Sequence, residues 1–268
     1  MNTTDIGICT WSVGNDIDRI RNVLTQGGVT RLHLDVSAAA RFQDTVANEA
    51  WTVSGMMLSF PQEDYSTLER IRKTGGIVPD AHWQHNRLLA LDAIQTTAIW
   101  RVPFLSFHAG FIDAAHPSTY DCFCSRLTEL ADASRSAGVK LILETGQETA
   151  TELKQLLEHL NHPALGVNFD PANMLLYGKG DPIAALEVLA PWVVHVHLKD
   201  ALPSTDSTQW GIEVPWGEGA VGVQRFFEQL QSIGYAGYAA VEREAGSQRE
   251  ADMLSALQQT RNHLKSVP

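Results

Sequence analysis

The chain has 268 residues, of which 44% are hydrophobic and 19% charged, so it can bury a large core and does not have the composition of a disordered protein. Its formal net charge is −11, which disfavours nucleic acids and anionic membrane surfaces as partners. No apolar stretch approaches the length of a membrane span and residues 1–11 show no secretory signal, so we expect a cytoplasmic protein. The expected partner is a small molecule, and the sequence leaves a homo-oligomer open.

Short apolar runs alternate with amphipathic stretches of helix length along the whole chain, which predicts repeated β–α units. The expected strands cover residues 6–13, 30–36, 52–60, 104–110, 139–145, 165–170, 193–199 and 237–243. The expected helices cover residues 16–26, 63–74, 80–100, 118–136, 148–160, 182–189, 222–233 and 247–264, with a short one between 37 and 51. A long connection without regular structure is expected at 200–221.

Eight strands that alternate with helices in a chain of this length predict an α/β fold, a (β/α)₈ TIM barrel formed by residues 1–268 as a single domain. A Rossmann fold is disfavoured because no glycine-rich phosphate turn follows an early strand.

The last four predicted strands each carry a metal-binding type of side chain at or near the carboxyl end. These side chains are Glu144, Asp170, His195 or His197, and Glu242. Strand side chains alternate in direction, and parallel strands of a barrel all end at one face, so the four groups should converge there. Three carboxylates and an imidazole in a small volume would repel and desolvate one another unless a divalent cation held them. Mn²⁺, Mg²⁺, Co²⁺ and Zn²⁺ all suit this donor set.

Each of these residues also has an ordinary structural interpretation. A single carboxylate at a strand end is more often solvated or salt-bridged, and a single strand histidine is more often a hydrogen-bonded core residue. Four such residues on consecutive strands favour the metal interpretation. His195 lies deeper than His197 on the same strand face, and we expect it to pack behind the site.

Segments of the C-terminal half resemble the sugar phosphate isomerase/epimerase family of xylose isomerase-like TIM barrels. They are LILETG, GVNFDPANMLLYGKGDP and HVHLKDA within residues 139–201, WGIEVPWGEGAVG at 210–222 and VEREAG at 241–246. The resemblance implies that Glu144, Asp170, His197 and Glu242 bind a divalent metal. The HLKD run is also similar to the HLND run of endonuclease IV relatives, which favours His197 over His195.

Further residues are expected around the mouth of the barrel as substrate contacts. They are His108, Asn173, Lys199, Trp210, Glu213 and Trp216. Lys199 lies on the strand face of His197, where it could polarise a carbonyl or pair with a carboxylate. The two tryptophans of the long connection could stack on the C–H faces of a sugar or simply pack the connection onto the barrel. Glu213 could reach the site or remain solvated.

The resemblance implies a metal-dependent isomerase or epimerase that acts on a sugar, a sugar phosphate or a related polyol by proton transfer through an enediolate. Glu144 and Glu242 would be the groups that move protons. A sugar or inositol-type dehydratase is the first alternative, since the same proton abstraction can precede loss of water. The ketose 3-epimerases of the family carry His where Asn173 stands and Arg where Pro203 stands, so the particular sugar is not inferred.

Two other functions are compatible with the metal site. An apurinic endonuclease would need a multinuclear zinc cluster, but Asn173 replaces one expected His and no Asp-x-His pair follows HLKD. The acidic charge also disfavours DNA. A non-catalytic sugar-binding barrel is the other, because a metal site alone does not establish turnover.

Overall fold

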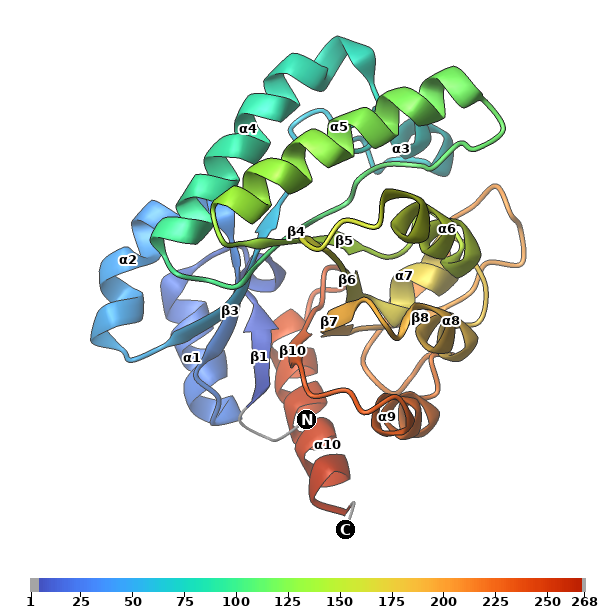
Figure 1. The fold of residues 1–268 in the computed structure, drawn as a ribbon. Helices are drawn as coiled ribbons and strands as arrows, with labels where there is room; N and C mark the ends of the chain where they lie inside the picture. Colours follow the sequence, from blue (N-terminus) through green and yellow to red (C-terminus); the bar gives the residue numbers. More distant parts are fainter. Residues whose placement is uncertain (1–4, 267–268) are drawn as a thin grey trace.

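Eight parallel strands close into a barrel with helices on its outside, as Figure 1 shows for the computed structural model, which describes residues 5–266. Around the barrel the order is β1-β10-β7-β6-β5-β4-β3-β2. These strands are β1 (Ile6–Cys9), β2 (Arg31–Asp35), β3 (Thr52–Leu58), β4 (Phe104–Phe107), β5 (Lys140–Glu144), β6 (Leu165–Phe169), β7 (Val193–Leu198) and β10 (Tyr238–Val241). The predicted (β/α)₈ fold class is confirmed.

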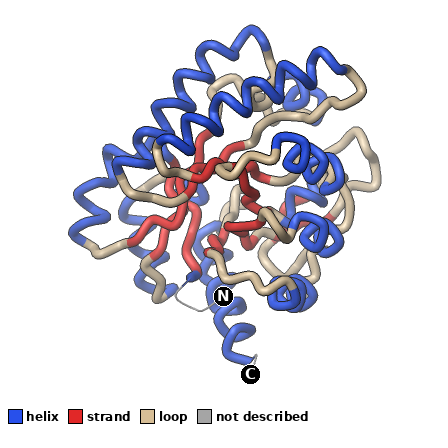
Figure 2. Tube along the Cα trace, in the orientation of Figure 1, coloured by secondary structure: helices blue, strands red, loops and turns tan. Residues whose placement is uncertain are grey.

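Helices form the outer layer around the central strands, which Figure 2 distinguishes by colour. They are α1 (Ile17–Gly27), α2 (Ala39–Asn48), α3 (Leu68–Thr74), α4 (Asp80–Ile99), α5 (Pro117–Ser136), α6 (Ala150–Leu160), α7 (Pro171–Leu176), α8 (Pro182–Leu189), α9 (Val223–Ser232) and α10 (Arg249–Ser266). Because helices cover the outside of the sheet and side chains fill its inside, the strands are short, apolar and almost fully buried. Among the described residues, none of the helices has the length and apolarity of a membrane span.

Local capping explains where several helices begin. Thr149 and Glu152 form a reciprocal capping box at the start of α6, and Asp16 caps α1 by accepting two backbone N–H groups. Thr67 accepts from the N–H of Arg70, so α3 begins at Leu68. The prediction of a helix from residue 63 was therefore wrong at its start.

Three further predictions need correction. The first strand ends at Cys9, because Thr10–Val13 form the 3₁₀ helix η2, which Gly14 ends in a left-handed conformation. The fourth strand ends at Phe107 rather than at residue 110. Helix α7 was not predicted, although Asp170 followed by Pro171 is a typical helix start.

The connection at 200–221 is ordered, contrary to prediction. β8 (Asp200–Leu202) and β9 (Ile212–Val214) pair as an antiparallel hairpin. The Asp200 carboxylate accepts from the N–H groups of Gly217, Gly219 and Val221, which folds the rest of the connection back onto the hairpin. A Cβ at Gly219 would lie 2.2 Å from Asp200 Oδ1, so only glycine fits there.

Candidate metal centre and substrate cavity

The four predicted ligands converge at the carboxyl ends of β5, β6, β7 and β10. Glu144 ends β5, Asp170 follows β6, His197 lies in β7 and Glu242 follows β10. All four are buried, and each offers a nitrogen or oxygen atom within 4.8 Å of the others. His197 Nδ1 is at the centre, 3.3 Å from Glu144 Oε1, 3.2 Å from Glu242 Oε2 and 3.7 Å from Asp170 Oδ2.

Hydrogen bonds fix the two strand ends that carry Glu144 and Asp170. Thr145 donates its hydroxyl to the carbonyl of Asp170 and accepts the Asp170 N–H, so the ends of β5 and β6 are tied together. Asp170 Oδ1 accepts the N–H groups of Ala172 and Asn173 and caps α7. Its other oxygen, Oδ2, has no hydrogen-bond partner and faces His197. One carboxylate thus holds a helix and also presents an oxygen to the cluster.

Three buried atoms that face one another lack hydrogen bonds, namely His197 Nδ1, Asp170 Oδ2 and Glu242 Oε2. Lys199 Nζ lies 3.0 Å from Glu242 Oε2, but this ion pair does not have hydrogen-bond geometry. A buried polar atom that makes no hydrogen bond lowers the stability of the folded protein, and such atoms are rare in native structures. Together with Glu144, these atoms fit a divalent cation, since they form a set of oxygens and one imidazole nitrogen on a common centre.

The pKa shifts within the cluster also fit a bound cation. Burial raises the pKa of the Asp170 carboxyl. Burial alone would lower the pKa of His197, but the carboxylates of Glu242 and Glu144 raise it well above its ordinary range. Without a metal, the cluster is therefore balanced by an imidazolium and by the ammonium of Lys199. A bound cation would take the place of the His197 proton.

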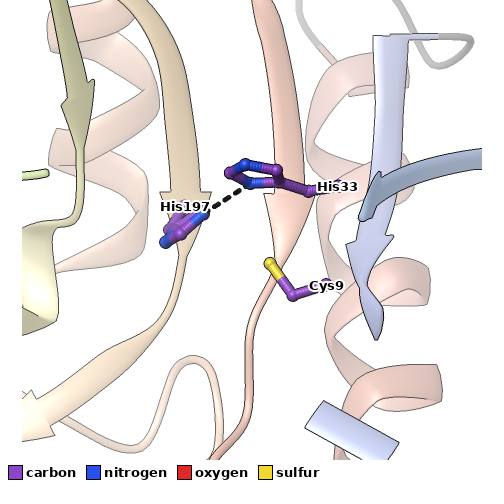
Figure 3. A group of neighbouring side chains, drawn as sticks. All are labelled: Cys9, His33 and His197. Carbon is purple, nitrogen blue, oxygen red and sulfur yellow. Dashed lines mark hydrogen bonds between the residues drawn. The ribbon is translucent and has the colours of Figure 1, made fainter. Parts of the chain in front are cut away.

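A layer of uncharged groups lies beneath the ligands and holds His197 from behind. His197 Nε2 is 3.0 Å from His33 Nδ1 (Figure 3) and 3.1 Å from Asn168 Nδ2. His33 Nε2 bonds Ser106 Oγ in turn, at 3.0 Å. The barrel register shifts at His33 and at Asn168, as is common where a strand re-aims a side chain beside a site. If His197 donates from Nε2 to His33, and the Asn168 amide N–H is directed to Glu144 Oε2 instead, then His197 Nδ1 carries the lone pair that a metal needs.

His195 belongs to this lower layer, where its Nδ1 is 2.9 Å from Asn168 Oδ1. Burial lowers the pKa of His33 to about 3 and that of His195 well below its usual range, so both are neutral. Cys9 also lies beside His33 and His197 in Figure 3. Burial raises the pKa of its thiol to about 12, so without a metal the thiol is protonated at neutral pH.

A cavity of about 740 Å³, a size typical of small-molecule sites, opens beside the four candidate ligands. Of the predicted substrate contacts, His108, Asn173, Lys199, Trp210 and Glu213 line it. His108 Nε2 lies 3.7 Å from Glu144 Oε1, and its Nδ1 has no hydrogen-bond partner. Asn173 Nδ2 donates to Glu144 Oε1 at 3.1 Å, and Lys199 pairs with Glu242 and Glu244.

The prediction for Trp216 was wrong. Its indole is buried against Phe226 and Phe227 of α9 and is not among the residues that line the cavity. Trp210 lies at the cavity edge-on to Tyr177, with ring centroids 4.7 Å apart. Glu213 is neither solvated nor free, because its carboxylate accepts from Arg243 and from the N–H groups of Glu244 and Ala245. It holds the hairpin against the segment after β10.

Sequence reasoning missed Trp11, which lines the cavity and donates its indole N–H to Glu242 Oε1 at 2.5 Å. The turn η2 aims this side chain inward, and Ser12 Oγ anchors the turn by accepting the N–H of Arg243. Tyr65, Tyr177 and Glu244 were also not predicted at the cavity. A tryptophan directly after an apolar strand was the available signal for Trp11.

The family model described as "Xylose isomerase-like TIM barrel" matches residues 25–266. The chain is 28% identical to the crystal structure of a xylose isomerase domain protein from Planctomyces limnophilus, with a TM-score of 0.91 and 98% of each chain covered. It also shares the fold of a structure of L-ribulose 3-epimerase, at 16% identity and a TM-score of 0.74, over 97% of this chain and 94% of that one.

Curated relatives match the chain over about half of its length. It is 29% identical to the rhizopine catabolism protein MocC of Rhizobium meliloti, over 47% of this chain and 43% of that protein. It is 23% identical to an inosose dehydratase of Geobacillus thermodenitrificans, over 47% of each chain. The chain thus spans less than half the length of either relative in these alignments.

Proposed function

The chain belongs to the xylose isomerase-like TIM barrel family, and from this premise we propose that it is a divalent-metal-dependent isomerase or epimerase of a sugar or related polyol. The observation that carries the proposal is the convergence of His197 Nδ1, Asp170 Oδ2 and Glu242 Oε2, three buried atoms without hydrogen bonds, beside a substrate-sized cavity that Glu144 and Glu242 line. The resemblance to sugar isomerases and epimerases supports it.

Glu144, Asp170, His197 and Glu242 would hold the ion. When bound, a divalent ion polarises a substrate carbonyl and its neighbouring hydroxyl, which acidifies the C–H between them. We leave its identity open among Mn²⁺, Mg²⁺, Co²⁺ and Zn²⁺, because oxygen donors with one imidazole suit each of them.

The proton transfer itself is assigned to the two glutamates. Both border the cavity as well as the cluster, and they lie on different strands with His197 Nδ1 between them. One glutamate would remove the proton from the substrate carbon, leaving an enediolate, and the other would return a proton to the adjacent carbon or to the opposite face. Asn173 and Asn168 donate to Glu144, and Trp11 donates to Glu242, so both carboxylates are held in fixed planes.

A dehydratase is the second candidate, and the similarity to an inosose dehydratase favours it. Its first step would be the same proton abstraction. His108, whose Nε2 lies beside Glu144 and whose ring borders the cavity, would then be placed to donate a proton to a departing hydroxyl. Replacement of His108 by Asn should slow loss of water far more than it slows exchange of the substrate C–H with solvent.

The test is incubation of the Mn²⁺-loaded protein with ketoses and inososes in deuterated water, with NMR and mass analysis of substrate and product. Deuterium in an isomerised or epimerised product supports the proposal, and deuterium in a product that has lost water supports the dehydratase. Turnover with neither deuterium incorporation nor water loss would contradict proton transfer. Sugar binding without any exchange or product would indicate a non-catalytic barrel, and nicking of abasic DNA would indicate a nuclease.

A further inference from the structure

We propose that the cavity selects an uncharged sugar or polyol and rejects phosphorylated and carboxylated ones. This inference rests on the proposed function, because it takes the cavity above the metal cluster as the substrate site. It narrows the substrate class, since phosphate esters and sugar acids share the hydroxyl pattern of neutral sugars and would fit the same metal chemistry.

The charged groups that line the cavity are almost all acidic. Five carboxylates and one ammonium group lie along its wall, from Asp35, Glu144, Glu213, Glu242, Glu244 and Lys199. Asp170 adds another buried carboxylate behind Lys199. A divalent ion in the cluster would leave the cavity with a surplus of negative charge, which opposes an anionic substrate.

The one ammonium on the wall is already paired. Lys199 Nζ lies 2.6 Å from Glu244 Oε2, 3.0 Å from Glu242 Oε2 and 3.6 Å from Asp170 Oδ2. Among the described residues, no arginine lines the cavity. Arg243 is nearby, but its guanidinium binds Glu213 and Asp252. A phosphate or carboxylate entering the cavity would therefore break an existing ion pair to gain a cation.

Backbone N–H groups do not supply an anion site either. The first free N–H groups of α7, beside the cluster, are taken by Asp170 Oδ1. The first turn of α10, which follows the segment after β10, carries the acidic residues Glu250 and Asp252. The start of α7 is therefore not open to a phosphate, and the negative charge in the first turn of α10 opposes one there.

The rest of the wall suits a neutral sugar. Trp11, Tyr65 and Trp210 offer aromatic surfaces for C–H groups, with Met57 and Leu176 as further apolar contacts. His108, Ser59 and Asn173 supply polar atoms for hydroxyl groups. Among the described residues, the wall combines apolar surfaces with neutral polar groups and offers no unpaired cation, which suits hydroxyl and C–H patterns rather than an anion.

The experiment measures binding of matched pairs to the Mn²⁺-loaded protein by calorimetry. The pairs are D-fructose and fructose 6-phosphate, myo-inositol and myo-inositol 1-phosphate, and D-galactose and D-galacturonate. We expect the charged member of each pair to bind on the order of 100-fold more weakly than the neutral one, as like-charge contacts of several kcal/mol would produce. Tighter binding of any charged member, or binding of no neutral member, overturns the inference.

A charge variant locates the effect. Asp35→Asn removes one wall carboxylate that is outside the metal cluster. It should reduce the ratio of the affinities for the neutral and the charged member of each pair about tenfold. Asp44→Asn makes the same charge change on the exposed surface of α2 and should leave this affinity ratio unchanged. Equal affinity ratios in both variants would contradict the rejection of anions by the cavity wall. Exchange of substrate protons with a phosphorylated sugar would overturn the preference for uncharged ligands but not the proposed activity. Selective binding of neutral ligands without any proton exchange would overturn the proposed activity but not the preference.

Discussion

Two neighbouring layers of side chains inside the barrel are in hydrogen-bond contact but differ in charge. The upper one, the ligand layer, holds Glu144, Asp170, His197 and Glu242. The lower one, the histidine layer, holds His33, His195, Asn168, Ser54 and Ser106. Buried histidines occur in both. In the ligand layer the neighbouring carboxylates raise the pKa of His197 well above its ordinary range, whereas burial lowers that of His33 to about 3.

The difference shows that neighbours, rather than residue type, decide what a buried polar group does. In the histidine layer both ring nitrogens of His33 and of His195 have hydrogen-bond partners, so no charge is needed there. The ligand layer is left open, with three atoms that lack hydrogen bonds. An open, charged layer supported by a closed, neutral one is a suitable arrangement for an ion whose ligand must be held in one tautomer.

The largest effect is expected for the proton-transferring groups of the ligand layer. Glu144→Gln and Glu242→Gln should each lower the rate of substrate deuterium exchange about 10²- to 10⁴-fold, because an amide neither accepts nor returns a proton. The measurement is exchange under saturating Mn²⁺, followed by NMR. Glu218→Gln, on the surface outside the cavity, is the control and should exchange normally. Exchange at the normal rate in both ligand-layer variants would assign proton transfer to other residues.

Asp170→Asn tests the ligand layer without disturbing the fold. Asparagine also caps helices, so α7 should persist while the carboxylate charge is lost. We expect the Mn²⁺ affinity, measured by calorimetry, to fall by a factor of roughly 100 or more, since a metal ligand should matter at least as much as the groups behind it. The unfolding temperature in EDTA should change little. A normal Mn²⁺ affinity would place the ion elsewhere.

His33→Phe opens the histidine layer beneath a ligand. The ring volume is retained but the bond to His197 Nε2 is lost, so the metal-binding tautomer of His197 is no longer selected. We expect Mn²⁺ affinity about 10- to 100-fold lower, with the barrel intact by circular dichroism. His116→Phe, at an exposed histidine that bonds Asp113, should leave Mn²⁺ affinity unchanged. Equal affinities in the two variants would show that the layers are independent.

The sequence predicts that Glu144, Asp170, His197 and Glu242 converge, because they lie at or near strand ends, and the strand ends of a parallel barrel meet by topology alone. It predicts the cavity wall less well, since the wall depends on irregular backbone. Trp11 faces the cavity only because η2 interrupts the apolar run after Cys9. Trp210 and Trp216 belong to one connection, and only the β8–β9 hairpin decides that the first borders the cavity and the second packs on α9.

Glu148 is a buried carboxylate outside both layers and can be compared with Glu144. Glu148 follows β5 by four residues and is buried like Glu144, but no metal-binding cluster of the described residues includes it. Burial raises its pKa from 4.5 to about 8, so in the folded protein it is neutral at pH 7. Because the folded pKa exceeds the unfolded one, its contribution to stability is fully present below about pH 4.5 and is lost as the pH rises to about 8.

Glu148→Gln should therefore flatten the pH dependence of unfolding. Glutamine resembles the neutral carboxyl but cannot ionise, so the variant should gain about 3–4 kcal/mol relative to the natural chain between pH 5 and pH 8. The measurement is urea unfolding at both pH values in EDTA, which keeps metal linkage out of the comparison. Glu158→Gln, an exposed glutamate on α6, should follow the natural chain at both pH values. If the stability difference between Glu148→Gln and the natural chain is the same at pH 5 and pH 8, Glu148 is ionised in the folded protein. A buried carboxylate would then persist without a cation cluster, and the argument from the open ligand layer to a metal would weaken.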